Sequence, residues 1–478
     1  MTMLDDDPAA ARRLRAVQHR SARRARSEAG RQRRQQTPLE AHADVVHSGR
    51  PDPLEILTAQ DASRLPELVP IRHGRMSPTP FTMYRGAAAV MASDLSRGPT
   101  TDLAVQLCGD AHLSNFGMFY GPDRRIVIDV NDFDETIPGP FEWDVKRLVA
   151  SVVIAARENG FDAETTRRAS RASAVGYCAG VGRTSQLDPL TTVYERLEVQ
   201  RVIDQLQGKR RKRATKAARK SRAKTSMRAL GKLTDIVDGR RRIVADPPRV
   251  IPLDLGRHPE ALAQVLDFFE RYLDSVPAHR RALLDRYSIV DVAHKIVGVG
   301  SVGTRCVIVL LESGDGEPLF MQFKEAGRSV IEPYVTASDY DNQGERVVQG
   351  QRLMQTMGDI LLGWARFERD DGTNRDFYFR QLWDGKGSFD IDRMGRKAFV
   401  RYAEVCGRVL ALAHSRSGDA AMIAGYVLDD PHDDTGASGA HFIDALEEFG
   451  HRYADVAEAD HTLYLGAIRA GLIEIAEG

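Results

Sequence analysis

The sequence predicts a mixed α+β fold in which a larger, mostly helical lobe carries a smaller β-rich lobe. Two strand-like runs, residues 116–120 and 125–130, flank a Gly-Pro-Asp turn and predict a β-hairpin between helices. From residue 289 the chain becomes rich in glycine and β-branched residues, which predicts a three-strand meander, a helix and two further strands. The last hundred or so residues instead show the period of helices.

The first block of the larger lobe is expected over residues 51–288. Residues 145, 148, 149, 152 and 156 are apolar and share one helical face, which supports a helix over 142–158. The other elements expected here are a helix over 87–94, a strand over 103–108, the hairpin, and helices over 163–181, 195–206, 262–274 and 278–287. The second block, residues 394–478, is expected to complete this lobe with helices over 396–413, 439–457 and 464–475.

The smaller lobe is expected over residues 289–393. A glycine-rich stretch separates the first two strands of its meander, and a Gly/Asp turn separates the second from the strand that ends at Lys324. A helix over 345–357 and strands over 361–368 and 377–382 follow.

Composition excludes several classes of protein. The 478 residues include 67 Lys+Arg and 67 Asp+Glu, so the formal net charge is zero. That balance argues against an overall polycation that compacts DNA and against an acidic disordered chain. Hydrophobic residues make up 42% and charged residues 28%, which is typical of globular proteins with a sizeable core.

The basic residues gather in two segments. Residues 12–34 hold ten arginines and a single acid, and residues 208–232 hold twelve Lys or Arg and no acid. The first segment belongs to residues 1–50, which lack an apolar period and are expected to form a flexible or loosely helical basic arm. The second segment is interpreted either as a solvated insertion or as a contact for a polyanion such as nucleic acid.

Neither the cysteines nor the apolar runs indicate export or membrane insertion. No two of the four cysteines form a CxxC pair, so the sequence suggests neither a zinc site nor a disulfide framework. The N-terminus is too charged for a secretory signal, and the best apolar run, residues 148–156, is too short to span a bilayer. We expect a cytoplasmic protein without membrane contact.

The first chemistry-bearing motifs lie on either side of the hairpin. The loop Cys108-Gly-Asp-Ala-His-Leu-Ser-Asn115 precedes it, and Asn131-Asp-Phe-Asp134 follows it. Phosphoryl transfer needs a carboxylate that orients the attacking hydroxyl, and oxygen ligands for Mg²⁺. Asp110 suits the first role, and Asn115 with Asp132 suits the second. Surface turns use the same residue types, but the ordered pair of motifs favours phosphoryl transfer.

A glycine-rich sequence, Gly298-Val-Gly-Ser-Val-Gly303, precedes a β-branched run over residues 304–311. A dinucleotide-binding fold would place a helix there, whereas a glycine loop between two strands covers the ATP phosphates of kinases. Lys324 ends the next strand and is suited to pair with phosphates. Its acidic partner on the following helix is expected to be Glu345, with Glu332 as the alternative. The residues expected to approach the phosphates are Gly298, Gly300, Ser301 and Gly303.

Five further polar residues have open roles. His414 either ends a helix or supports the 108–115 loop from behind, and Arg416 and Asp419 could reach a phosphate or a metal. Asp144 is favourable beside a helix N-terminus through the helix dipole alone. As a buried acid it could also hold the backbone of the 108–115 loop. Arg85 is either structural or an anion contact.

From about residue 70 to the C-terminus, the chain resembles a bacterial family designated domain of unknown function 2252. Residues 75–86 and the runs GDAHLSNFG, NDFDE, VGVGSVGTR, FKEA and AHSRSGD carry this resemblance. More distantly, GDAHLSN resembles the HGDxHxxN loop of aminoglycoside phosphotransferases and other protein-kinase-like enzymes, with Cys108 in place of the first histidine. NDFD resembles their DFG-type motif, with Asp134 in place of glycine. Arg380 falls where their hinge would lie.

The distant resemblance implies a two-lobed protein-kinase-like fold with a permuted order of elements. Kinases run glycine loop, lysine, helix, hinge, catalytic loop and DFG motif, whereas here the catalytic-loop motifs come before the glycine loop. Reading the chain cyclically restores the order, so the small β-rich lobe is expected as an insertion after the catalytic-loop hairpin. Circular permutation is tolerated where chain termini lie close together at the surface.

The same resemblance implies an ATP- and Mg²⁺-dependent phosphotransferase that acts on an unknown small-molecule or protein acceptor. Two alternatives stay open: a nucleotidyl transferase that moves AMP on the same scaffold, and a non-catalytic nucleotide-binding or interaction protein. The expected site residues are Asp110, His112 and Asn115 for catalysis; Asn115, Asp132 and Asp134 for the metal; and the glycine loop, Lys324, Glu345 and Arg380 for the nucleotide.

Overall fold

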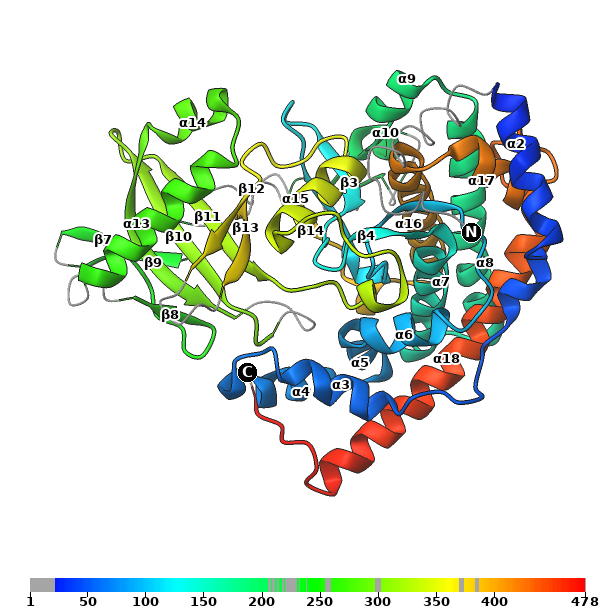
Figure 1. Ribbon diagram of the computed structural model, residues 1–478, viewed down its shortest axis with the longest axis horizontal. Helices are drawn as coiled ribbons and strands as arrows, with labels where there is room; N and C mark the ends of the chain where they lie inside the picture. The colour runs from blue at the N-terminus through cyan, green and yellow to red at the C-terminus, as the bar shows by residue number, and fades with distance from the viewer. Residues whose placement is uncertain are drawn as a thin grey trace, which may run out of the picture.

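The structure is a computed structural model that describes residues 22–477, except 205–207, 209–210, 213–214, 217–218, 220–229, 232, 238, 254–258, 297–301, 369–373 and 383–386. It confirms a mixed α+β fold with several sheets. Figure 1 shows a six-stranded sheet at one end of the molecule and most of the long helices at the other.

Four long helices form what we call the helical body: α7 (Phe141–Glu158), α8 (Ala163–Ser185), α16 (Arg396–Ser417) and α18 (Ala440–Arg469). They enclose the largest apolar core, in which almost every residue of α7 is buried. Helices α8 and α16 cross closely because Gly407 has no side chain: a Cβ there would lie 1.9 Å from the Ser173 carbonyl oxygen. The helices predicted from the apolar period near 142, 163 and 396 are confirmed.

The C-terminal helices differ from the prediction in two ways. The segments expected as two helices, 439–457 and 464–475, form the single helix α18, which ends at Arg469. The polar residues between the two expected segments did not break the helix, because Asp460 binds Arg50 at 2.6 Å and is buried. A further helix, α17 (Ala420–Val427), was not predicted.

The six-stranded antiparallel sheet has the order β12-β13-β11-β10-β9-β8. Its strands are β8 (Val250–Pro252), β9 (Tyr287–Lys295), β10 (Cys306–Ser313), β11 (Pro318–Ala326), β12 (Gly363–Phe367) and β13 (Arg375–Gln381). Only β8, which ends in Pro252, was not expected; an edge strand tolerates proline. Helix α13 (Pro259–Asp274) covers one face, where Tyr272 stacks on Phe379 with ring centroids 4.2 Å apart.

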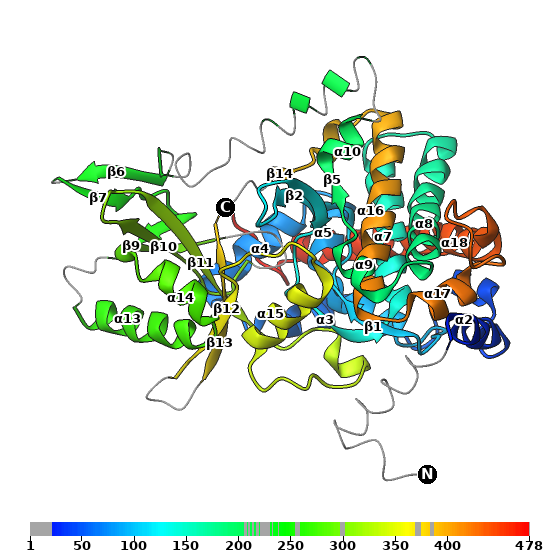
Figure 2. The same ribbon diagram turned by 90° about the horizontal axis from the view of Figure 1, so that it is seen from above.

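Helix α15 (Gln343–Met354) lies between this sheet and the helical body (Figures 1 and 2). It packs against β11, β12 and β13 on one side and against α16 and β1 on the other. The sheet also carries α14 (Ala278–Leu284) and the neighbouring hairpin β6 (Thr234–Val237) and β7 (Arg240–Ile243). Thus α15 is one of the elements through which the two ends of the molecule contact each other.

The predicted hairpin is confirmed as β2 (Phe116–Tyr120) and β3 (Ile126–Val130). The short strands β14 (Gly387–Ser388) and β5 (Leu197–Glu198) extend it on either side. The strand expected before it, β1 (Ala104–Leu107), pairs instead with β4 (Ile137–Pro140), which follows the hairpin. This pairing brings both ends of the hairpin segment together against the helical body.

Of the basic arm expected over residues 1–50, residues 1–21 lie outside the described residues, and the structure describes the rest. Helix α2 (Arg23–Gln32) lies along α17, and Gly30 and Gly425 allow the close approach. Arg34 donates to the Leu428 carbonyl at 2.7 Å and pairs with Asp429. Of the two forms expected for the arm, the described part is helical and not flexible, because its arginines meet carboxylates and carbonyls at the two ends of α17.

Four short helices, α3 (Pro53–Asp61), α4 (Val69–Met76), α5 (Pro80–Gly86) and α6 (Ala88–Leu95), lie below the helical body in Figure 1. Helices α9 (Pro189–Tyr194) and α10 (Val199–Asp204) precede the basic segment 208–232, most of which lies outside the described residues. Among the helices that the structure describes, none combines the length and apolar character needed to cross a bilayer.

Candidate functional site

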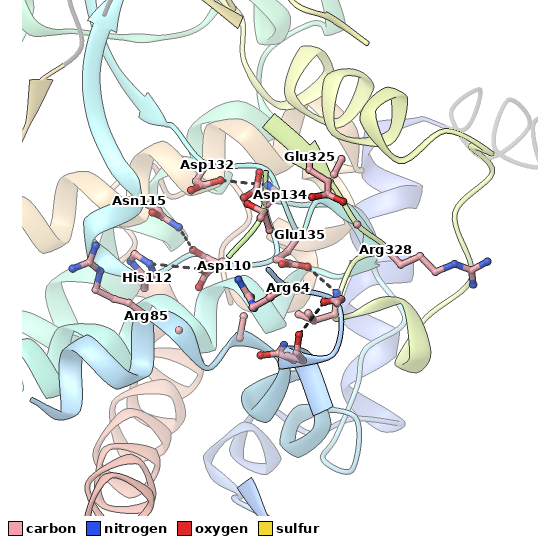
Figure 3. A pocket seen from close by; sticks show the side chains of 18 residues that line it. Arg64, Arg85, Asp110, His112, Asn115, Asp132, Asp134, Glu135, Glu325 and Arg328 are labelled. Carbon is pink, nitrogen blue, oxygen red and sulfur yellow. Dashed lines mark hydrogen bonds and ion pairs between the residues drawn. The ribbon is translucent and has the colours of Figure 1, made fainter. Parts of the chain in front are cut away.

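A cleft of about 190 Å³ opens where the six-stranded sheet meets the helical body and helices α3 and α5. Figure 3 shows its charged lining. The loop after β1 supplies three of these residues, the segment after β3 supplies three, and the end of β11 and the N-terminal helices supply the rest. The labelled residues are Arg64, Arg85, Asp110, His112, Asn115, Asp132, Asp134, Glu135, Glu325 and Arg328. Five predicted site residues thus lie in one cleft.

The loop 108–115 is held from behind by Asp144, at the start of α7. The buried Asp144 carboxylate accepts hydrogen bonds from the backbone N–H groups of Cys108, at 2.8 Å, and Gly109, at 3.0 Å. His414 Nε2 lies 3.1 Å from the same carboxylate, and the hydroxyl of Tyr177 lies 2.9 Å from its other ring nitrogen. Of the roles left open for Asp144 and His414, the structure therefore shows support of this loop.

Glycine is required at position 109 of this loop. Its φ is 83°, in the left-handed region that glycine occupies without strain. A Cβ there would also lie 2.4 Å from the carbonyl oxygen of Glu135, in the segment that follows the hairpin. Gly109 thus allows the two predicted motifs to pack directly against each other.

Asp110 is anchored by an arginine that the sequence reasoning missed. Arg147 Nε donates to Asp110 Oδ1 at 2.6 Å, and Arg147 also donates to the Tyr84 carbonyl at 2.9 Å. The second oxygen, Oδ2, lies 3.6 Å from His112 Nε2 and makes no hydrogen bond within the described part of the chain. Burial raises the pKa of Asp110, and Arg147 opposes that rise.

Arg147 could have been found from the sequence. It follows Asp144 by three residues in α7, and residues three apart lie on the same face of a helix. One helical face therefore supplies both the carboxylate that holds the loop backbone and the cation that holds the Asp110 side chain.

Asn115 closes the loop. Its side-chain amide donates to the Asp110 carbonyl at 2.8 Å, and its own carbonyl accepts from the Asn131 N–H at 3.0 Å. With its nitrogen used in this way, the side-chain oxygen of Asn115 remains available to a ligand in the cleft.

Lys324 of β11 reaches across to the segment after β3. Its ammonium group binds Asp134 Oδ2, and the hydroxyl of Tyr378 donates to Asp134 Oδ1 at 2.8 Å. Lys324 and Tyr378 are opposite each other in the β11–β13 register, which directs both side chains to one carboxylate. Burial alone would raise the pKa of Asp134, but the charge of Lys324 and these hydrogen bonds hold it below its ordinary value.

The predicted partner of Lys324 is wrong. Glu345 hydrogen-bonds Gln349 at 3.4 Å, and Glu332 accepts from the Ser338 N–H at 3.2 Å, so neither acid pairs with Lys324. The physical reason is that the ammonium group of Lys324 already binds Asp134, in the segment after the hairpin.

Helix α15 instead contributes Arg346, the neighbour of Glu345. This buried arginine donates to the carbonyl oxygens of Thr136 at 2.6 Å, Asp134 at 2.8 Å and Gly327 at 2.9 Å. It therefore binds the segment after the hairpin to the end of β11. A shift of one residue turns a helix by about 100°, so the choice between Glu345 and Arg346 needed the packing of α15.

Three predicted glycine-loop residues, Gly298, Gly300 and Ser301, lie outside the described residues. Gly303 has a φ of 94°, and its carbonyl accepts from the Leu65 N–H at 2.8 Å. Arg380 donates to Gln322 at 2.9 Å, and its guanidinium lies 5.7 Å from the centre of the Tyr378 ring. Arg380 therefore contacts Gln322 and Tyr378 on the sheet and is not among the residues that line the cleft.

Arg416 and Asp419 do not line the cleft either, so the role considered for them at a phosphate or metal has no place in this site. Arg416 donates to the carbonyl oxygens of Glu195, at 2.7 Å, and Met354. Asp419 caps α17 and pairs with Arg26 at 2.8 Å. Both residues hold the end of α16 and the start of α17 to their neighbours.

The oxygen donors of the cleft suit Mg²⁺ bound together with phosphate. Among the described residues there is no group of three or more His, Cys, Asp or Glu side chains arranged to hold a metal on their own. Magnesium ordinarily uses only one or two protein carboxylates together with water and phosphate oxygens. Asp132 and the amide oxygen of Asn115 fit that pattern, whereas both oxygens of Asp134 are bound to Lys324 and Tyr378.

Comparison with known proteins finds one family. A family model described as "Uncharacterized protein conserved in bacteria (DUF2252)" matches residues 64–467. No curated protein and no solved structure matches the chain. The matched region includes every element that lines the cleft except the end of α3, and it covers most of the 478 residues. The chain therefore belongs to the DUF2252 family.

Proposed function

We propose that this protein is an ATP- and Mg²⁺-dependent phosphotransferase with a circularly permuted, protein-kinase-like fold. One observation carries the proposal: Lys324 pairs with Asp134, 190 residues away in the sequence. That pair brings the strand after the glycine loop to the segment after the hairpin; in kinases the corresponding lysine and DFG motif meet at the ATP phosphates and Mg²⁺.

The order of elements supports the permutation. From β9 the chain runs strand, glycine-rich segment, strand, Lys324 strand, helix, two strands and then α16, which is the order of a kinase up to its catalytic loop. In this chain the next element in space is β1: Ser417, at the end of α16, accepts a hydrogen bond from the Gln106 N–H at 3.0 Å. Strand β1 leads directly into the loop 108–115. The kinase order is thus continued across a spatial contact instead of a peptide bond.

Asp110 is suited to act as the base. In the proposed reaction its Oδ2 accepts the proton of the acceptor hydroxyl while the hydroxyl oxygen bonds to the γ-phosphorus of ATP. The bond between that phosphorus and the β–γ bridging oxygen breaks, and ADP leaves with the electron pair. A base works best when its pKa is moved toward the working pH, and burial moves the pKa of Asp110 in that direction.

The other residues proposed for the site bind Mg²⁺ and the phosphates and orient Asp110. Asn115 and Asp132 would hold Mg²⁺, which when bound neutralises phosphate charge. Lys324 is buried and does not itself line the cleft, but it binds Asp134, which does, and it would pair with a phosphate oxygen there. Asn115 also fixes the Asp110 backbone through its 2.8 Å hydrogen bond.

The test is turnover of ATP labelled either at the γ- or at the α-phosphate, offered with Mg²⁺ and a mixture of hydroxyl metabolites. We expect transfer of the γ label by the wild type. Asp110→Asn should lower transfer by at least a hundredfold while ATP still raises the melting temperature, because the base does not contact ATP. Lys324→Met should lower both transfer and ATP affinity.

Asp123→Asn is the matched control, because Asp123 is at the turn of the same hairpin, outside the cleft, where it pairs with Arg196. It should transfer phosphate as the wild type does. Transfer of the α label would replace the proposal with nucleotidyl transfer. Absence of both transfer and ATP-dependent stabilisation would refute the phosphotransferase.

A further inference from the structure

Arg85 is a cation of the cleft that forms no ion pair with any described carboxylate. It lies in the last turn of α5 and lines the cleft beside His112 and Asn115 (Figure 3). Its guanidinium forms no hydrogen bond and no ion pair with any described residue, and its Nε is shielded from solvent as well. A guanidinium N–H that loses water without gaining a partner destabilises the fold, and a ligand in the cleft is the natural source of that missing contact.

The backbone on both sides of Arg85 is fixed. The Tyr84 carbonyl accepts from Arg147 at 2.9 Å, and the Gly86 carbonyl accepts from Arg72 at 3.2 Å. Tyr84 also donates its hydroxyl to the Arg147 carbonyl at 2.9 Å. Arg85 is therefore presented to the cleft from a rigid support, as a binding residue needs.

The other cations at this site have partners among the described residues, apart from Arg328, which is exposed. Lys324 is paired with Asp134, and Arg147 with Asp110. Glu325 of β11 is shared by two arginines: Arg305, just before β10, at 3.2 Å, and Arg375 of β13 at 3.0 Å. Arg64 has an Nε without a partner, but its Nη1 donates to the Val302 carbonyl at 2.5 Å, next to the glycine-rich segment. Arg85 alone among these faces the loop 108–115 with its whole guanidinium unpaired.

The position of Arg85 indicates which reactant it meets. Four carboxylates are near enough to act on the charge of Arg85: Asp110, Asp392, Glu158 and Asp132. None of the four forms an ion pair with it, and none belongs to the sheet. Lys324, by contrast, projects from the sheet toward Asp134. Arg85 thus stands on the side of Asp110 away from the phosphate-binding strand, where an acceptor would approach.

We infer that Arg85 binds an anionic group, a phosphate or a carboxylate, carried by the acceptor whose hydroxyl Asp110 deprotonates. That the bound molecule is a phosphate acceptor rests on the proposed function, whereas the anion site rests on Arg85 and its surroundings alone. The planar guanidinium can bind either anion through two parallel hydrogen bonds. Asp110 does not repel such an anion strongly, because Arg147 neutralises it at 2.6 Å.

The experiment measures binding of inorganic phosphate, glycerol 3-phosphate, glycerate and glycerol to the full chain by calorimetry, without nucleotide and then with a non-hydrolysable ATP analogue and Mg²⁺. We expect the anions to bind and glycerol not to bind. Arg85→Gln should weaken anion binding at least tenfold, which corresponds to about 1.4 kcal/mol. Stronger binding of glycerol 3-phosphate than of glycerate would identify a phosphate acceptor, and the reverse a carboxylate acceptor.

Two variants control the result. Arg328 lines the same cleft but is exposed and has no partner among the described residues, so Arg328→Gln should change anion affinity less than twofold. Lys324→Gln tests whether the anion binds at the nucleotide site instead: glycerate binding without nucleotide should depend on Arg85 and not on Lys324. If Lys324→Gln abolishes phosphate binding and Arg85→Gln does not, the anion sits at the nucleotide site and the inference is overturned.

Stability gives a second readout. Because Arg85 makes no hydrogen bond within the described protein, Arg85→Gln should keep or raise the melting temperature. A large fall would show that Arg85 holds the fold, and would overturn the inference. Anion binding that depends on Arg85 in a protein without ATP turnover would support the anion site and remove only the phosphotransferase assignment. If the protein transfers phosphate to an uncharged acceptor and Arg85→Gln does not change that rate, the phosphotransferase is supported and the anion site is overturned.

Discussion

Asp144→Asn tests how the loop 108–115 is held in place. Asp144 Oδ2 accepts from the Cys108 N–H at 2.8 Å and from His414 Nε2 at 3.1 Å, and Oδ1 accepts from the Gly109 N–H at 3.0 Å. Asparagine has the same shape, but one of the two oxygens becomes an NH₂ group that can only donate. The remaining oxygen can accept from both the Cys108 N–H and His414 if it takes the place of Oδ2. The NH₂ group then takes the place of Oδ1 and faces the Gly109 N–H, which loses its acceptor.

The magnitude follows from these three bonds. A buried backbone N–H left without an acceptor costs about 1–3 kcal/mol. The other two bonds lose the charge of their acceptor, and bonds to an ion are roughly twice as strong as neutral ones. Together we expect the free energy of opening this loop to fall by about 2–4 kcal/mol, which is roughly a thirtyfold to several-hundredfold change.

Amide hydrogen exchange measures this opening directly. The amides of Cys108 and Gly109 should exchange faster by the factor given above in Asp144→Asn, and phosphate transfer should fall with them. Glu142→Gln is the matched control: Glu142 is a buried acid in the same helical turn, and it accepts from the Thr101 N–H at 2.7 Å and from the Thr101 hydroxyl at 2.8 Å. It should accelerate exchange at Thr101 only. Unchanged exchange at Cys108 and Gly109 in Asp144→Asn would refute the reasoning.

Two further predictions concern the contact between α2 and α17 and the hairpin β2–β3. Gly425→Ala would place a Cβ 1.9 Å from the Ser27 carbonyl, so α2 should separate from α17 and its arginines should be cleaved faster by trypsin. Burial raises the pKa of Asp129 to about 6, although Arg416 opposes the rise. An ordinary aspartate releases its proton near pH 4, so between about pH 4 and 6 the folded state holds more protons, and stability should fall as the pH rises. Asp129→Asn should flatten that part of the melting-temperature profile.

Each of these predictions has a clear contrary result. Gly466→Ala, in α18 with no atom within 4 Å of the new Cβ, should leave tryptic cleavage unchanged. Equal cleavage rates in Gly425→Ala and Gly466→Ala would show that the α2–α17 contact does not depend on this glycine. For Asp129, calorimetric profiles of wild type and variant that run parallel from pH 4 to 7 would contradict the raised pKa.

Local properties of the sequence predicted most of the elements correctly. Alternation and turn residues predicted the hairpin β2–β3, and apolar period predicted α7, α8 and α16. The loop 108–115 and the NDFD motif flank one hairpin, so their meeting in one cleft follows from short connections in the chain. The errors lie where local signals were weak: a polar stretch inside α18, and an arginine-rich segment whose order depends on distant carboxylates.

Local patterns were thus enough to identify the motifs and their order, because turn chemistry and hydrophobic period are properties of neighbouring residues. The partners of the charged groups instead depend on tertiary packing. That Lys324 binds Asp134 and not Glu345, that Arg147 anchors Asp110, and that Arg85 has no partner among the described residues all depend on how a sheet and helices distant in sequence pack. A buried charge must be matched by whatever packing brings within a few ångströms, and sequence spacing does not fix that distance.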